Sequence, residues 1–483
     1  MSINRFGLTG VAAALAFTLA GGAAQAQQPP ARDLTPRIEH DQERINLIRA
    51  RMARIQDAVD LKNLQGTFGY YFDKALWDDV VDLFAEGATM ELAKNGVYKG
   101  KESIRNYLYS LTGGKPGLRF GQLNNTFQLQ PVVTISKDGK TATGRWNSIM
   151  QTAAKYDKNG DGGEWGGGVY ENTYVKEDGV WKIKTMRFYI EFYAPYDKGW
   201  TKGPKDMVNQ YLASKVKPDA KPSGDYKSYP GFDIPPFSYK NPVTSGFHFG
   251  LSEQEVAEAK KTPPHPVFEK TVDSLEAQVR DLELQIKRLK AYDEVENVEA
   301  SYGYYVDQSM GDQIANLFVE DGTLEILGRG VFVGLPRIVT YMERLGCCGP
   351  APNVLFNHMQ LQHVIHVSPD AKTAEMRARL FVMFGREGQV GQWGEGVYEN
   401  KFINDNGVWK YRNLNGYQTF YTPYDKGWGR ESSGLFDYFP GFPPDQPHSV
   451  EYKPYPTVFV PPFHYPNPVT GQPVIPPQAD QPK

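Results

Sequence analysis

The chain has 483 residues, with 53 Lys and Arg against 56 Asp and Glu and a formal net charge of −3 at pH 7. This balance provides no overall field that would draw the chain to nucleic acid or to an anionic membrane surface, so a nucleic-acid partner is not expected. The length exceeds what one hydrophobic core usually serves, and it predicts two domains.

The first residues have the features of a secretory signal peptide. Arg5 precedes an apolar stretch over 8–20, and Ala24-Gln25-Ala26 has the small-x-small pattern of a cleavage site. The apolar stretch is too short and too rich in Ala and Gly to span a membrane, and no later segment approaches about 20 apolar residues. We therefore expect a cleaved leader, no membrane span, and a mature protein that is periplasmic or secreted.

The sequence contains one long internal repeat. Gly-Tyr-Tyr-Phe-Asp at 69–73 recurs as Gly-Tyr-Tyr-Val-Asp at 303–307, and Pro-Tyr-Asp-Lys-Gly-Trp occurs at both 195–200 and 423–428. Matches over this distance indicate a duplicated domain. The predicted organisation is a signal peptide (1–26), copy one (37–200), a Pro-rich arm (201–265), copy two (270–430) and a second Pro-rich arm (431–483).

A helix with a heptad pattern leads into each copy. The apolar positions are Ile45, Ile48, Met52, Ile55 and Val59 in copy one, and Val272, Leu275, Val279, Leu282, Ile286 and Leu289 in copy two. Such a pattern favours packing of the two helices against each other or against a second chain, as a coiled coil. The alternative is that each apolar stripe packs on the sheet of its own copy.

The rest of each copy alternates between helix and strand patterns and predicts an α+β fold. A curved, mainly antiparallel sheet with helices packed on one face fits this order. The arms have no helical or strand periodicity but many aromatic residues, so they are interpreted as extended segments lying in surface grooves. The expected elements are short helices (77–84, 311–318), strands (88–92, 323–327), amphipathic helices (101–111, 335–345) and long strands that end with 180–193 and 408–421.

A Tyr-Tyr-x-Asp helix end, followed by Leu-Phe and an acidic or Gly-rich turn, opens both copies. In this respect the chain resembles the SnoaL-like branch of the nuclear transport factor 2-like superfamily. The resemblance implies cone-shaped domains, and the superfamily includes dehydratases, isomerases, cyclases, lyases and members that only bind. The matching residues are Tyr71, Asp73, Trp77, Asp78, Leu83, Phe84, Gly100 and Ile104 in copy one, and Tyr305, Asp307, Asp312, Leu317, Phe318, Gly334 and Ile338 in copy two.

The resemblance implies a pocket inside the cone, lined by Tyr and Asp from the first helix and by His from the central strands. Copy two keeps this set, with His358 as general acid or base, Asp307 orienting it and Tyr305 polarising a substrate oxygen. Copy one has no His between its Tyr-Tyr-x-Asp motif and its tail, so copy two is the expected site. The other expected pocket residues are Tyr304, His363, Arg377, Trp393 and Tyr398, with Tyr71 and Asp73 in copy one.

Strand alternation leaves the histidine assignment open. It places His363 on the more apolar face and His358 on the opposite face, unless a bulge shifts the register. An alternative role for Asp73 and Asp307 is structural, in which each satisfies a helix end or pairs with the aligned Arg145 and Arg377. The tyrosines have the alternative of being pocket walls, and Trp393 that of a packing or rim residue.

Two further motifs have simple interpretations. Cys347 and Cys348 are adjacent, which is typical of small residues in a turn, with a vicinal redox disulfide as the alternative. Asp157–Gly162 has the spacing of the start of a calcium loop, but the twelfth position is Gly168, so a polar hairpin is favoured. No nucleotide or metal motif is present, and we expect no cofactor and no metal.

Two functions follow as hypotheses. The first is an exported, cofactor-free lyase, dehydratase or isomerase that acts on a small apolar or aromatic molecule in the copy-two cone. The second is a non-catalytic periplasmic ligand-binding or assembly protein. In both, the two copies pair within one chain or the chain forms a homodimer.

Overall fold

The computed structural model describes residues 33–154, 163–202, 212–241, 243–244, 251–263, 268–326, 328–346, 349, 351–434 and 439–477. The predictions for the signal peptide, for Asp157–Gly162 and for Cys347 and Cys348 lie outside these ranges. No helix among these residues is long and apolar enough to cross a membrane.

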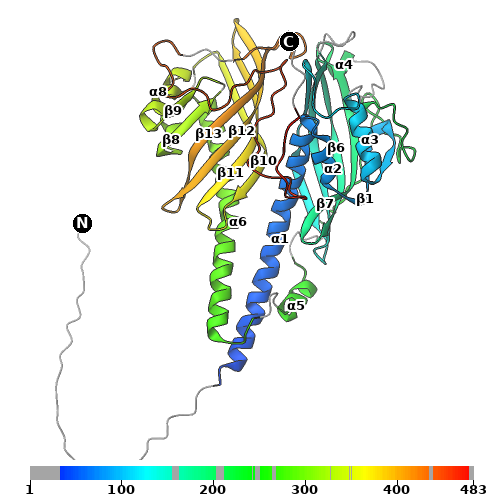
Figure 1. Cartoon of the computed structure of the whole chain (residues 1–483), viewed down its shortest axis with the longest axis vertical. Coiled ribbons are helices and arrows are strands. Elements are labelled where there is room, and N and C mark those ends of the chain that lie inside the picture. Colours follow the sequence, from blue (N-terminus) through cyan, green and yellow to red (C-terminus); the bar gives the residue numbers. More distant parts are fainter. Residues whose placement is uncertain are drawn as a thin grey trace, which may run out of the picture.

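Two domains of the same design stand side by side above a pair of long helices (Figure 1). Copy one consists of α1 (Thr35–Asp73), α2 (Trp77–Asp82), β1 (Phe84–Leu92), η1 (Ala93–Asn95), β2 (Val97–Lys99), α3 (Gly100–Leu111), β3 (Gln122–Thr126), β4 (Leu129–Ile135), β5 (Thr141–Ala154), β6 (Gly163–Glu177), β7 (Val180–Pro195) and α4 (Gly199–Lys202). Copy two consists of α6 (Val272–Asp307), α7 (Gly311–Ala315), β8 (Phe318–Ile326), β9 (Val331–Val333), α8 (Leu335–Gly346), β10 (Val354–Val367), β11 (Thr373–Arg386), β12 (Val390–Asp405) and β13 (Val408–Pro423).

Each copy has one curved sheet. The strand orders are β2-β1-β7-β6-β5-β3, with β4 also on β5, and β10-β11-β12-β13-β8-β9. All neighbours are antiparallel except β1–β7 and β8–β13, which are parallel. The predicted α+β fold with two tandem cone-like domains is confirmed, and the sheets are mixed because the first strand of each copy joins the last one.

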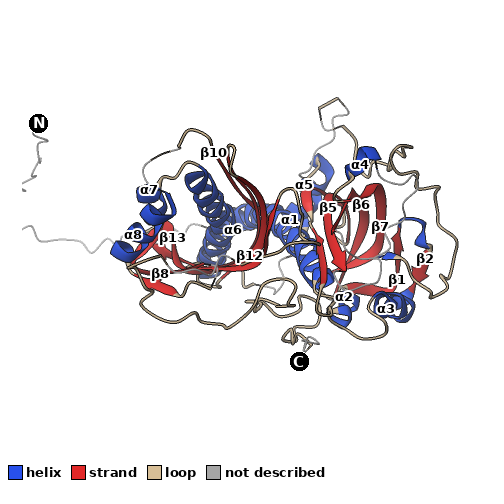
Figure 2. Cartoon of the chain, turned by 90° about the horizontal axis from the view of Figure 1, so that it is seen from above, coloured by secondary structure: helices blue, strands red, loops and turns tan. Residues whose placement is uncertain are grey.

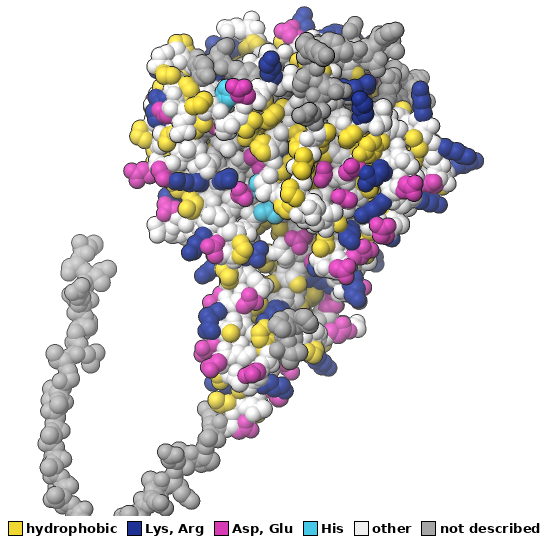
Figure 3. Space-filling view, in the orientation of Figure 1, with side chains coloured by type: hydrophobic (Ala, Val, Ile, Leu, Met, Phe, Trp, Pro, Cys, Tyr) yellow, Lys and Arg dark blue, Asp and Glu magenta, His cyan; other side chains and the backbone are white. Residues whose placement is uncertain are grey.

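Helices α1 and α6 pack against each other at their N-terminal halves. Ile45 and Met52 of α1 form a small buried cluster with Leu282 of α6. Ile55 and Ile286, which belong to the same predicted stripes, remain exposed. The contact therefore covers only part of each stripe, and charged side chains surround it (Figure 3).

The C-terminal half of α1 lies between the two sheets, whereas α6 lies on the opposite side of the copy-two sheet (Figure 2). Asn63 of α1 makes two hydrogen bonds to the backbone of Ile365, at 2.8 and 3.1 Å. The Tyr70 hydroxyl donates to the carbonyl oxygen of Gln362 at 2.8 Å. Copy one thus contacts copy two through its first helix, which packs on the outer face of the copy-two sheet.

The two Pro-rich arms differ in how they pack, and the first also differs from the prediction of an extended segment. The first arm contains a helix, α5 (Glu253–Lys261), which begins with a capping box formed by Ser252 and Glu255. In the second arm Phe463 packs edge-on against Tyr71 of copy one, with ring centroids 5.2 Å apart. Its counterpart in the first arm, Phe237, is 59% exposed.

Candidate functional site

A β-bulge in β10 decides where the histidines lie. The pairing of β10 with β11 shifts between Leu361 and Val364, and Gln362 has a positive φ of 53°. His358, before the bulge, packs against the ring of Tyr302 on α6. His363, after the bulge, places its Nδ1 atom 2.9 Å from Glu296 on the same helix. Both histidines therefore face α6, as the alternative with a shifted register required.

His358 is a neutral imidazole in an aromatic environment. Its side chain is buried, and its Nε2 atom lies 3.4 Å from the Tyr398 hydroxyl. Burial lowers the pKa of His358 to about 3, because the charged form would lose its hydration. Among the described residues, Nδ1 of His358 has no hydrogen-bond partner.

Glu299 is a buried carboxylate that the sequence analysis did not identify. Its Oε2 atom accepts hydrogen bonds from Asn400 Nδ2 and from the Tyr411 hydroxyl, both at 2.8 Å. Its Oε1 atom is buried and has no partner within the described part of the chain. Burial raises the pKa of Glu299, since the interior disfavours the carboxylate. Tyr302, three residues later on α6, faces the same side of the helix.

The ring of Tyr302 packs against His358, Tyr398 and Tyr411. Its centroid lies 6.4 Å from that of His358 and 6.0 Å from those of Tyr398 and Tyr411. Gln360, on the same strand as His358, has both amide atoms buried without a partner in the described structure. Buried polar atoms are nearly always hydrogen-bonded in folded proteins, so this group marks a place suited to a polar ligand atom.

The predicted helpers of His358 lie elsewhere. Asp307 accepts a hydrogen bond from the backbone N–H of His358 at 2.5 Å, so it fixes the strand and does not orient the imidazole ring. Burial raises the pKa of Asp307, and this hydrogen bond opposes the rise. Tyr305 packs at the edge of the copy-two core, and Tyr304 is 72% exposed. The predicted contact between Asp307 and the ring of His358 is therefore absent.

Four other predicted site residues lie between the copies. Their positions correct the expected ion pairs: Asp73 pairs with Arg379 of copy two and not with Arg145, while Arg377 pairs with Glu399 and not with Asp307. Burial opposes the charge of Arg379, but Asp73 and Glu395 outweigh it and raise its pKa. The residues at this contact are Tyr71, which packs on Phe463; Asp73; Arg377, below the ring of Phe463; and Trp393, which donates to the Tyr196 hydroxyl at 2.8 Å.

The copy-one cone contains neutral groups at the same places. Gln65 occupies the position of Glu299, and its Oε1 accepts from Asn172 at 3.0 Å and from the Tyr174 hydroxyl at 2.8 Å. Its amide donates to Gln128 at 2.7 Å, whereas no such bond joins the equivalent Glu299 and Gln360. Trp146 fills the interior of copy one, where copy two has the small Ala378.

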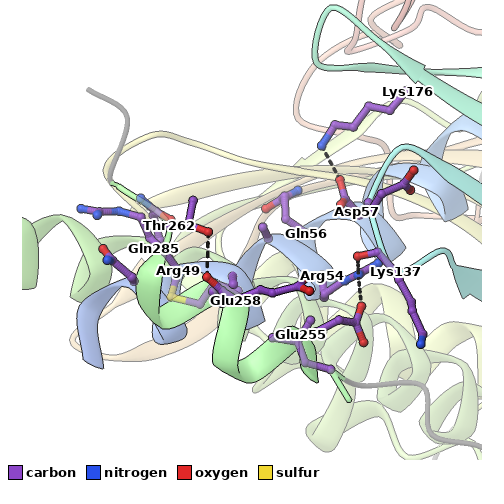
Figure 4. Close-up of a pocket in the computed structure, with 18 of the residues that line it drawn as sticks. Arg49, Arg54, Gln56, Asp57, Lys137, Lys176, Glu255, Glu258, Thr262 and Gln285 are labelled. Atoms are coloured by element: carbon purple, nitrogen blue, oxygen red, sulfur yellow. Dashed lines mark hydrogen bonds and ion pairs between the residues drawn. The ribbon is translucent and has the colours of Figure 1, made fainter. Parts of the chain in front are cut away.

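A groove of about 900 Å³ lies outside both cones, between α1, α5 and α6 (Figure 4). Its wall contains two ion pairs, Arg54 with Glu255 at 2.7 Å and Lys176 with Asp57 at 2.6 Å. These pairs neutralise four of the charged side chains that line the groove, while Arg288, which also lines it, has a buried Nε atom without a partner among the described residues.

The fold is a tandem pair of α+β cones, and the copy-two cone buries a carboxyl group, Glu299, and an imidazole, His358. The sequence pattern of the SnoaL-like domain matches residues 53–187 and 287–415, more than half of the chain. The protein belongs to the SnoaL-like family and carries two copies of its domain.

Solved structures similar to part of this chain include a dehydrochlorinase and the protein ActVI-ORFA. A hexachlorocyclohexane dehydrochlorinase, LinA type 2, is 20% identical and has a TM-score of 0.26, with 29% of this chain and 91% of that chain covered. ActVI-ORFA from Streptomyces coelicolor is 13% identical and has a TM-score of 0.24, with 26% and 96% covered. At this level of similarity, function has to be argued from the residues of the chain itself.

Proposed function

We propose that copy two binds a small apolar or aromatic molecule inside its cone and catalyses a cofactor-free proton transfer on it, as a lyase, dehydratase or isomerase does. The observation that supports this is the group of unpartnered buried polar atoms on Glu299, His358 and Gln360. Copy one has Gln65 and Thr126 at the first two positions, and it serves as the structural partner in this proposal.

Glu299 is the proposed general acid or base. A carboxyl group whose pKa is raised by burial exchanges a proton more readily near neutral pH than an exposed one does. The Tyr411 hydroxyl and the Asn400 amide hold one carboxyl oxygen, which leaves Oε1 to take or give the proton.

His358 and Tyr398 are the proposed partners of a substrate oxygen. A neutral imidazole and a phenol can donate hydrogen bonds to an oxygen that gains negative charge, without the charge repulsion or hydration that an ion would bring. Asp307 holds the backbone of His358 and is a positioning residue in this scheme. The ring of Tyr302 forms the wall between the acid–base group and the hydrogen-bond donors.

A thermal-shift screen with aromatic, steroid and polyketide-like molecules tests for binding, followed by turnover assays on the molecules that bind. The matched variant is Met376→Gly with Ala378→Trp, which copies Gly144 and Trp146 and fills the copy-two cone with a ring. We expect this variant to fold, as shown by circular dichroism, and to lose binding. Undiminished binding by the filled cone would refute the assignment of the site.

The alternative function is ligand binding or assembly without catalysis. It is favoured by the dense ring packing around His358 and by the use of Asp307 for a backbone hydrogen bond. It predicts that ligands found in the screen are released without chemical change. It also predicts that Glu299→Gln alters the affinity for the ligand and nothing else.

Export and pairing complete the proposal. The N-terminal pattern supports cleavage after Ala26, which mass spectrometry of the exported protein tests by a mature chain that starts at Gln27. The ion pair between Asp73 and Arg379 supports the pairing of the two copies as one unit within the chain.

A further inference from the structure

The contact between the copies uses two different surfaces. We call the surface of copy one at this contact the helix face. We call the surface of copy two at this contact the sheet face. The helix face of copy one comprises Asn63, Tyr70, Tyr71, Asp73 and Leu123, and the sheet face of copy two comprises Gln362, Arg379, Trp428, Tyr455 and Phe463. Because both copies have the same fold, each chain retains a second helix face, on copy two, and a second sheet face, on copy one.

The helix face of copy two is exposed at its apolar positions. Tyr304 is 72% exposed, whereas the equivalent Tyr70 is 2% exposed. Leu355 is also exposed, whereas the equivalent Leu123 is buried beside Trp428. These large side chains have the positions of interface residues without the partner that copy one has.

The sheet face of copy one shows the same difference. Trp200 is 55% exposed, whereas the equivalent Trp428 is fully buried. Tyr229 is exposed, whereas the equivalent Tyr455 is buried and donates to the backbone of Gly121 in copy one. Exposed apolar side chains gathered on one surface are typical of an interaction site.

At Phe237 the first arm repeats a contact that the second arm makes at Phe463. The guanidinium of Arg145 lies 4.0 Å from the ring centre of Phe237, and that of Arg377 lies 4.0 Å from the ring centre of Phe463. Phe463 goes on to pack against Tyr71, while Phe237 ends at the surface. An incoming helix face would therefore meet an ordered surface.

We propose that the exposed sheet face of copy one binds the exposed helix face of copy two in a second molecule of this chain. Tyr305, the counterpart of Tyr71, would then cover Phe237. Contacts between two different surfaces join molecules head to tail, and they close into a ring or continue as a chain according to the rotation between neighbours.

The proposed contact between two molecules differs from the contact between the two copies in its charged groups and in how closely the two surfaces approach. The contact between the copies contains the buried charges of Asp73, Arg379 and Glu395, but the equivalents of the last two are Asn147 and Gly167. The contact between molecules is therefore formed mainly by rings and neutral hydrogen bonds, and its affinity should change little with salt. A Cβ atom on Gly66 would lie 2.9 Å from Val364, and copy two has Ala300 at this place, so the two molecules approach less closely than the two copies do.

Light scattering and mass photometry of the full chain test the proposal between about 0.1 and 50 µM, the range that separates weak from tight association. We expect species of two or more chains that persist when the salt concentration is raised. Phe237→Asp damages only the sheet face of copy one, and Tyr304→Asp damages only the helix face of copy two, so each variant alone should be monomeric.

Mixing the two variants gives the decisive measurement. Phe237→Asp retains an intact helix face and Tyr304→Asp an intact sheet face, so the mixture should form a complex of two chains and nothing larger. Val408→Asp, at an exposed site on a hairpin, is the matched control and should associate like the wild type. A wild-type chain that stays monomeric over the whole range would overturn the proposal, as would a mixture of the two variants that fails to associate.

Discussion

Copy one and copy two share one fold but bury their ionisable groups in different places. The interior of copy two contains the ionisable Glu299 and His358, where copy one contains Gln65 and Thr126. At the helix end, copy one buries Asp73 against an arginine of copy two, whereas the equivalent Asp307 meets only a backbone N–H. In the proposed function the chemistry is assigned to the copy-two cone, whereas the buried ion pair between the copies comes from the helix end of copy one.

The largest effect is expected from the two helix-end aspartates. Asp73→Asn leaves Arg379 with one buried carboxylate in place of two, and breaking a buried ion pair of this kind lowers the free energy of unfolding by about 3 kcal/mol. Asp307→Asn removes a hydrogen bond to a backbone amide, with an expected loss of about 1 kcal/mol. Urea unfolding of both variants measures the difference, and equal losses would contradict the division described above.

The second prediction concerns the buried acid. Glu299→Gln keeps the shape of the side chain and removes its proton exchange, so turnover of a substrate found by screening should fall about 100-fold or more. Stability should not fall, because Gln65 accepts the equivalent hydrogen bonds in copy one. Gln65→Glu is the control: it buries a new carboxylate in copy one, so it should lower stability and leave turnover intact. Full turnover by Glu299→Gln would exclude this carboxyl group from the mechanism.

The third prediction tests the contact at the bulge. Asn63→Ala leaves the N–H and C=O groups of Ile365 without partners in a buried position, which lowers the free energy of unfolding by about 2 kcal/mol. The equivalent Asn297 is exposed, and its side-chain amide donates to Asp293 at 3.3 Å, so Asn297→Ala should change stability by less than about 0.5 kcal/mol. A similar loss in both variants would show that the two helix faces are equally engaged.

The sequence predicted the fold well because its signals are local or repeated. Each signal depends on nearby residues: strand alternation, the Tyr-Tyr-x-Asp motif and the recurring tail. Because the domain is duplicated, each signal also occurs twice in the chain. The partner of Asp73 could not be predicted, because Arg379 reaches it from the other copy across 306 positions of sequence. The α5 helix was missed although Ser252 and Glu255 have capping-box spacing.

Part of the candidate site could be predicted from the sequence. The choice of copy two follows from the comparison of the copies. The inward position of His358 does not, because strand alternation places it on the opposite face and only the three-dimensional pairing of β10 reveals the bulge. Glu299 was missed because it lies on a long helix rich in acidic residues, where an acidic side chain usually faces water. Its spacing of three residues from Tyr302 was the available signal, since positions i and i+3 share a helix face.

The last prediction concerns stability at acid pH. Below pH 6.5 the unfolded chain binds a proton at His358, while the folded protein, with a pKa of about 3 at this site, does not. The free energy of unfolding should therefore fall as the pH falls from 6.5 towards 3, by about 1.4 kcal/mol per pH unit for one such group. His366 acts in the same direction, although part of its side chain reaches solvent: desolvation where it packs against Tyr465, together with the neighbouring His464, lowers its pKa to about 4.

His358→Asn removes the contribution of one histidine and leaves that of the other. Between pH 6 and about 4.5, the slope of the unfolding free energy against pH should decrease by about 1.4 kcal/mol per pH unit. This is the value expected for nearly one proton. Thr126→Asn, at the equivalent place in copy one, replaces a group that does not titrate and should leave the slope unchanged. An unchanged slope in His358→Asn would mean that this histidine is accessible to protons in the folded state, and the neutral hydrogen-bonding role proposed for it would then fail.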